Sequence, residues 1–153
     1  MQNYSEYKET QIGWLVLIPF AAILFFLPIA WYYQWGDHPI DSTMLIVLEA
    51  MFLFMLFLFV YMKTYVNEQE IKLVYGIGIF VKKIPISDIR SVVPVRTKWY
   101  YGAGIKKIPN GMLYSIHGLN AVELTFKSSS KVVRVGTKDS SSLVNEVNIR
   151  LPK

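Results

Sequence analysis

Two long apolar stretches constrain this 153-residue chain more than any other feature. Residues 13–33 contain 18 apolar side chains in 21 positions, and residues 43–62 contain 18 in 20. At about 1.5 Å of rise per residue, each stretch forms a helix long enough to cross a hydrocarbon core of ~30 Å. A helix that is apolar on every face has no place inside a globule of this size. We therefore expect a transmembrane helical hairpin over residues 13–62, with helices at about 13–33 and 43–62.

The rest of the chain has the composition of a water-soluble domain. The whole sequence is 53% hydrophobic and only 18% charged, which excludes a disordered polypeptide. It has no cysteine, which excludes a disulfide scaffold, a thiolate metal site and a cysteine nucleophile. The first apolar stretch is longer than the apolar core of a signal peptide, so we expect it to stay in the protein.

Charge is distributed unevenly about the two apolar stretches. Residues 1–62 carry one lysine and five acids, a net charge of −4, whereas residues 63–153 carry fifteen basic and six acidic residues, a net charge of +9. The short link between the stretches contains Asp37 and Asp41 and no lysine or arginine. The positive-inside rule therefore predicts that both termini are cytoplasmic. Residues 1–12 would be a cytoplasmic N-terminal tail, and residues 63–153 a cytoplasmic domain.

The cytoplasmic part has the short period of antiparallel strands. Residues 122–127 alternate strictly and residues 131–135 return after three serines, which predicts a hairpin. Two further hairpins are predicted, from 71–75 to 79–84 and from 104–108 to 112–116. Pro94 indicates that the strand 89–95 is an edge strand or ends there. Asp139 can cap a helix over 140–151. The predicted fold class is α+β: two transmembrane helices, then a bent antiparallel sheet or small barrel capped by a C-terminal helix.

Several short motifs of this domain resemble bacterial pleckstrin-homology-like (PH-like) membrane proteins. They are Gly102-Ala103-Gly104-Ile105-Lys106, Gly111-Met112-Leu113-Tyr114, Gly118, Ala121-Val122-Glu123-Leu124 and the run from Arg134 to Asp139. The resemblance implies a PH-like domain after a two-helix hairpin, a place in the bacterial inner (plasma) membrane, and no known catalysis. It carries no ligand with it, because a fold does not transfer one.

Residues for catalysis or metal binding are sparse. His38 lies between two aspartates in the outer link, and His117 has no acidic neighbour within five residues. Neither position offers the converging ligands of a metal site or the base and orienting group of a catalytic one. We therefore expect no enzyme, no metal, no cofactor and no small-molecule substrate.

A set of basic and aromatic residues is the main candidate for binding. It consists of Arg96, Lys98, Trp99, Tyr100, Lys106 and Lys107, with Tyr101 beside them. Cations with aromatic rings suit an anionic membrane surface, where ammonium groups meet phosphates and rings settle among headgroups. The same residue types suit single-stranded nucleic acid, and they also suit a solvated strand with aromatics in the core. The membrane anchor makes lipid the better ligand, and we expect no nucleic acid partner.

Glu49 is the only charged residue inside the second apolar stretch. It lies six residues from Thr43, about 9 Å along a helix. It can be interfacial, it can be protonated and donate to the other helix, or it can be a functional intramembrane contact.

These observations predict a non-catalytic, membrane-anchored PH-like module. It would bind anionic lipid headgroups or a partner membrane protein at the cytoplasmic face, with a homo-oligomer as a further possibility. The alternative is an accessory subunit of a membrane transport or secretion complex, in which Glu49 packs against a larger partner.

Overall fold

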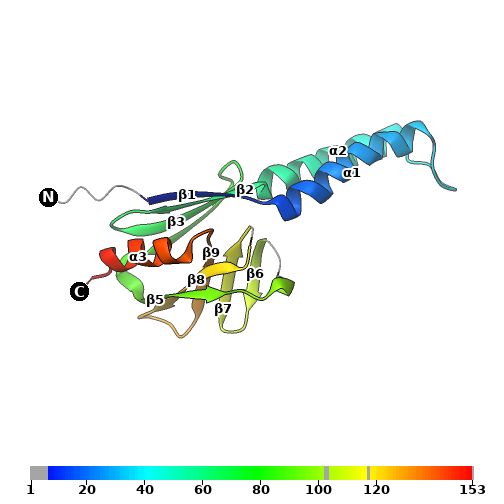
Figure 1. The fold of residues 1–153 in the computed structure, drawn as a ribbon. Coiled ribbons are helices and arrows are strands. Elements are labelled where there is room, and N and C mark those ends of the chain that lie inside the picture. Colours follow the sequence, from blue (N-terminus) through cyan, green and yellow to red (C-terminus); the bar gives the residue numbers. More distant parts are fainter. Residues whose placement is uncertain (1–6, 102–103, 117, 153) are drawn as a thin grey trace.

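The computed structural model describes residues 7–101, 104–116 and 118–152. A hairpin of two helices extends from one end of a domain built of two sheets and a short helix (Figure 1). The helices are α1 (Trp14–Tyr32), α2 (Ser42–Phe59) and α3 (Ser140–Arg150), with 3₁₀ turns η1 (Ile86–Asp88) and η2 (Trp99–Tyr101). The strands are β1 (Tyr7–Ile12), β2 (Tyr61–Val66), β3 (Glu70–Tyr75), β4 (Phe80–Pro85), β5 (Ile89–Arg96), β6 (Gly104–Ile108), β7 (Gly111–Ser115), β8 (Asn120–Phe126) and β9 (Val132–Gly136).

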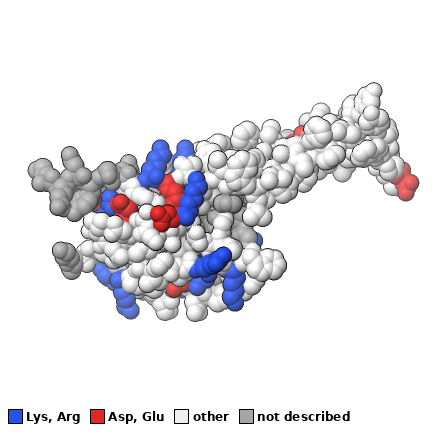
Figure 2. Space-filling view, in the orientation of Figure 1, with Lys and Arg blue, Asp and Glu red and all other residues white. Residues whose placement is uncertain are grey.

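The helical hairpin stands clear of the rest of the protein. Both α1 and α2 are long and apolar enough to cross a membrane, and none of their residues is buried. The Asp41 carboxylate caps α2 by accepting a hydrogen bond from the Met44 amide at 2.8 Å, and Phe20 packs edge-on against Phe52. Lysine and arginine gather on the domain, and none is visible on the hairpin (Figure 2).

No flexible linker separates the hairpin from the domain. β1 ends at Ile12, α1 begins at Trp14, and the single residue between them, Gly13, donates to the Val60 carbonyl at 2.8 Å. β1 and β2 then pair antiparallel from Ile12 with Tyr61 outward. A Cβ on Gly13 would lie 2.8 Å from the Phe59 carbonyl oxygen, so only glycine fits this crossing. The helices are therefore an insertion between two adjacent strands of one sheet.

Residues 7–12, which the sequence analysis assigns to a tail, form β1. Their inner face is polar and contacts the segment that joins β9 to α3. Gln11, which is buried, donates to the Gly136 carbonyl at 2.7 Å. The Glu9 carboxylate accepts from the Thr137 hydroxyl at 2.5 Å and from the Lys138 amide at 2.7 Å. β1 thus joins the first sheet to the C-terminal part of the domain.

The domain consists of two sheets around one core. The first sheet has the order β1-β2-β3-β4 and the second β5-β8-β9-β7-β6. Apolar side chains from the inner faces of both sheets form the core, which Leu143 and Val147 of α3 complete. Asp139 accepts from the amides of Ser141 and Ser142, so the predicted cap of the C-terminal helix is confirmed.

The three predicted strand hairpins are confirmed, as β3–β4, β6–β7 and β8–β9. Pro94 lies in β5, an edge strand, as its missing amide donor requires. The prediction of one bent antiparallel sheet or barrel was wrong in two respects. The described strands form two sheets that do not close into a barrel, and η1 separates β4 of the first sheet from β5 of the second. In addition, β7 and β9 pair in parallel.

α2 ends at Phe59, three residues before its predicted end, and β2 begins at Tyr61. The reason is the pairing with β1, whose hydrogen bonds take over from those of the helix at Val60.

Candidate functional site

The connection from β5 to β6 projects the most exposed aromatic side chain of the described residues. Buried Thr97 fixes the start of this connection, because its amide and hydroxyl both donate to the Leu119 carbonyl at 2.7 Å. The chain then turns through η2, where the Tyr101 amide donates to the Lys98 carbonyl. Trp99 is left 79% exposed and Tyr100 54% exposed. The two adjacent rings form an exposed apolar patch, and large patches of this kind mark interaction sites.

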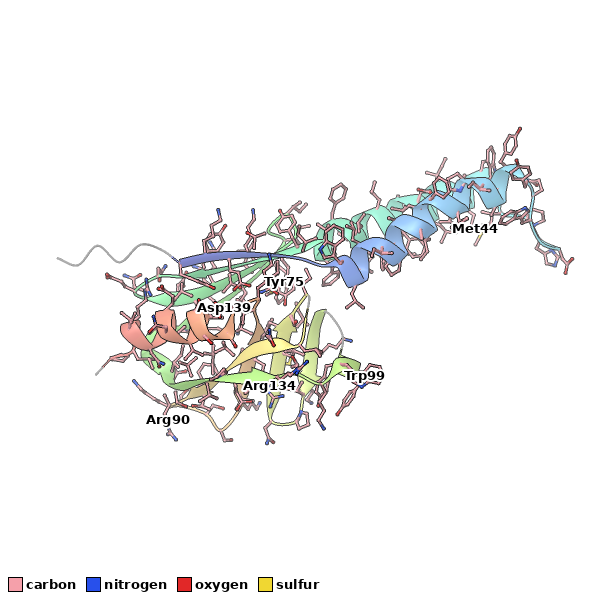
Figure 3. All side chains as sticks on the ribbon, viewed as in Figure 1. Met44, Tyr75, Arg90, Trp99, Arg134 and Asp139 are labelled. Carbon is pink, nitrogen blue, oxygen red and sulfur yellow. The ribbon has the colours of Figure 1, made fainter. Side chains whose placement is uncertain are left out.

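Lys98 and Tyr100 form a cation–aromatic pair on η2. The Lys98 ammonium lies 5.6 Å from the centre of the Tyr100 ring. A hydrogen bond with the Tyr100 hydroxyl raises the pKa of Lys98 above its ordinary value. Arg96, at the end of β5, is also exposed. Trp99 lies at the end of the domain toward which the hairpin extends (Figure 3). We call Arg96, Lys98, Trp99 and Tyr100 the η2 surface.

A groove lies between the base of the hairpin and β6. Its volume is about 330 Å³. The hairpin contributes Val16 and Phe20 from α1 and Met55 and Phe59 from α2, and the domain contributes chiefly Ile105 and Lys106. Lys106 is exposed, and it takes part in no ion pair among the described residues. One cation therefore borders a groove whose other walls are mainly apolar.

The structure separates Lys107 from Lys106. Lys107 lines a different hollow, of about 530 Å³, together with Asn110 at the β6–β7 turn and Lys131 at the β8–β9 turn. These turns are at the opposite ends of the strands from Gly104 and η2. The six residues that the sequence analysis groups are thus distributed over three places: the η2 surface, the groove and this second hollow.

A second apolar projection, which the sequence analysis did not identify, lies beside the end of α2. It is the β3–β4 turn, where Ile77 and Ile79 are 63% and 59% exposed. The Gly76 amide donates to the Tyr61 carbonyl, and a Cβ on Gly76 would collide with the carbonyl oxygens of Phe57 and Leu58. The signal in the sequence is an isoleucine between two turn glycines, where a polar residue is expected.

The outer face of the first sheet also combines lysines with tyrosines. Lys63 lies 4.9 Å from the centre of the Tyr61 ring, and Lys8 lies 5.6 Å from that of Tyr65. The four residues come from the paired strands β1 and β2. Sequence reasoning missed the contact between Lys8 and Tyr65 because it depends on pairing of segments that the hairpin separates.

Glu49 lies in α2 and is partly exposed as a whole. Its Oε1 atom is buried and has no hydrogen-bond partner among the described residues. The structure therefore leaves one carboxylate oxygen of the hairpin unsatisfied.

A buried tyrosine is a further polar group in the core of the domain. Burial raises the pKa of Tyr75, with a smaller effect from neighbouring Tyr114, and its hydroxyl has no partner in the described part of the chain. Within residues 7–101, 104–116 and 118–152, no three His, Asp or Glu side chains are grouped as metal ligands. His117, Gly102 and Ala103, singled out in the sequence analysis, lie outside the described residues.

The chain matches no protein-family model, and comparison with curated proteins finds no relative. The function must therefore be inferred from the η2 surface, the groove and the hairpin.

Proposed function

We propose that this chain is a non-catalytic module of the bacterial cell membrane, in which the hairpin spans the bilayer and holds a PH-like domain at the cytoplasmic face. The η2 surface would rest among anionic headgroups, with Trp99 and Tyr100 at the interface and Arg96 and Lys98 on phosphates. The observation that supports this best is the exposure of Trp99 on the end of the domain that faces along the hairpin. Tryptophan and tyrosine favour the headgroup level of a bilayer.

Charge supports the same arrangement. Residues 63–153 carry a net charge of +9, and each basic side chain that reaches an anionic leaflet contributes about 1 kcal/mol. Ile77 and Ile79 are exposed in the turn that packs against the end of α2, where a bilayer interface would cover them. The distribution of lysine and arginine favours cytoplasmic termini.

The test uses the full chain in nanodiscs with one spin label on an introduced cysteine. No native cysteine has to be replaced first, because the sequence contains none. A label on Tyr100→Cys is compared with one on Asn148→Cys, which is exposed near the end of α3, far from the hairpin. In anionic discs, and only there, we expect two results for the label at position 100. It should be accessible to oxygen dissolved in lipid, and it should be shielded from a water-soluble nickel complex. High salt should reverse this effect. Equal accessibility at the two positions would overturn the proposal.

Glu49 supports a second candidate function, an accessory subunit of a membrane transport or secretion complex. An unsatisfied carboxylate oxygen within an apolar hairpin is costly, and a polar group from a neighbouring protein would offset that cost. Purification in a gentle detergent, followed by mass spectrometry, tests this role. A stoichiometric partner that is retained by Glu49→Gln and lost from Glu49→Leu supports it, whereas recovery of the protein alone argues against it.

A further inference from the structure

We propose that the groove between the hairpin and β6 is a binding site for a single anionic phospholipid, with one acyl chain against the hairpin and its phosphate at Lys106. This inference rests on the proposed function, because it requires the hairpin to lie in the bilayer. It goes further by assigning a stoichiometric ligand to one place, where the η2 surface requires only general contact with headgroups.

The walls of the groove come from both sides of the proposed membrane boundary. Phe20 is six residues from the start of α1, about 9 Å along the helix, whereas Lys106 belongs to the domain. A molecule that fills the groove must therefore be apolar over part of its length and end at the level of the domain. Phospholipids are the molecules of a bilayer with this form.

Charge selects the class of phospholipid. Lys106 is the only charged side chain that lines the groove in the described part of the chain, and no carboxylate there neutralises it. Among the described residues, nothing lies within 4 Å of a Cβ placed on Gly104, two positions before Lys106, which leaves room for a headgroup on this part of β6. An anionic headgroup would satisfy the ammonium, whereas a zwitterionic one brings its own cation.

The base of the hairpin gives the groove a fixed shape. The Gly13 amide donates a hydrogen bond to the Val60 carbonyl, and Phe59 packs against the core residue Tyr75 with ring centres 6.4 Å apart. Val16 and Phe59 therefore keep their positions relative to the domain. A site that is already formed loses little entropy when a lipid enters, so one lipid can be held more tightly than the surrounding ones.

The experiment is native mass spectrometry of the full chain, released from detergent with either phosphatidylglycerol or phosphatidylcholine of the same acyl chains. We expect one phosphatidylglycerol to be retained by the wild type. Lys106→Gln should weaken this adduct about tenfold, the loss of one charge-assisted contact. The matched control is Lys107→Gln, which removes the same charge from the second hollow and should keep the adduct. Lys106→Arg should restore binding.

A second pair of variants tests the acyl chain. Val16→Trp fills the groove from α1, whereas Ile18→Trp adds the same ring to an exposed position of α1 outside the groove. We expect only Val16→Trp to lose the lipid. Equal loss in both lysine variants, retention by Val16→Trp, or no selective adduct in the wild type would each overturn the site. The spin-label result separates the two proposals: contact at position 100 without a selective adduct removes the groove and leaves the η2 surface.

Discussion

Glu9 offers the sharpest test of how β1, the strand that leads into the helical hairpin, is attached to the rest of the domain. Its carboxylate accepts from the Thr137 hydroxyl and the Lys138 amide, which lie more than 120 positions further along the chain. Tyr7 also donates to it, at 2.9 Å. The change Glu9→Ala removes the acceptor and leaves both long-range donors without it.

The magnitude follows from what those donors can do instead. Hydrogen bonds to a charged group contribute about 1.5–3 kcal/mol each. The Lys138 amide is exposed and can turn to water, and the Thr137 hydroxyl also lies 3.1 Å from the Asp139 carbonyl, to which it can donate. Glu9→Ala should therefore lower the free energy that holds β1 on the domain by about 2 kcal/mol in total, near the lower end of that range. This corresponds to about 30-fold more frequent opening, at 1.4 kcal/mol per factor of ten.

Hydrogen–deuterium exchange of the full chain in detergent measures this opening directly. We expect the amides of residues 7–12 and of the segment from Thr137 to Ser140 to exchange about 30-fold faster in Glu9→Ala, with little change in β8. Glu68→Ala is the matched control, because Glu68 is exposed in the β2–β3 turn. If exchange in β1 accelerates less than threefold, or equally in the two variants, the polar face of β1 does not hold the sheets together.

Three further predictions concern glycine packing, a buried phenol and a helix cap, each measured by guanidinium unfolding in detergent followed by near-ultraviolet circular dichroism. Gly76 and Gly78 both have positive φ, but only a Cβ on Gly76 meets α2, so Gly76→Ala should cost about 1–3 kcal/mol more than Gly78→Ala. Burial raises the pKa of Tyr75 above its ordinary value of 10.0, so the stability that the protonated phenol gives the folded state is complete below pH 10 and is lost as the pH rises further. Tyr75→Phe should therefore reduce the alkaline loss of stability. It should also raise the free energy of unfolding at neutral pH by about 1 kcal/mol, because it removes a hydroxyl without a partner among the described residues. Hydrogen bonds from Ser142 lower the pKa of Asp139 below 3.8, so this cap stabilises α3 above that pH, and its contribution is lost as the pH falls through the lowered value. Asp139→Asn keeps the hydrogen-bond acceptor and should show a smaller loss of stability in acid. An unchanged acid profile would contradict this.

Local pattern was sufficient to predict the hairpins of the domain. The strict alternation of residues 122–127 and the turn at Asn110-Gly111 each identify strands that pair with their neighbour in sequence. The Asp139 cap and the edge position of Pro94 follow from single-residue chemistry in the same way. These features need no information from distant parts of the chain.

Several features that sequence reasoning missed depend on pairing between distant segments, whereas the exposed β3–β4 turn and the separation of Lys106 from Lys107 have local signals. β1 is a six-residue segment whose partner, β2, follows the hairpin. β2 itself begins at the end of an apolar stretch, so the apolar pattern predicts helix for Tyr61 and Met62. The parallel pairing of β7 with β9 has no local signal. The basic and aromatic set was grouped by sequence proximity, whereas alternation along β6 directs Lys106 and Lys107 to different faces.

The insertion of the hairpin between paired strands also changes what weak surface contacts can achieve. A domain on a flexible linker could present any face to a bilayer, and each contact would oppose the entropy of orientation. Here both ends of the hairpin continue directly into β1 and β2, so the fold narrows the range of orientations that the domain can take. In the proposed arrangement, contacts of about 1 kcal/mol from Lys98 and its aromatic neighbours are then intramolecular, and a few are sufficient to keep the η2 surface on the membrane. Lengthening the Gly13 junction by flexible residues should therefore release the surface even though every contact residue is kept.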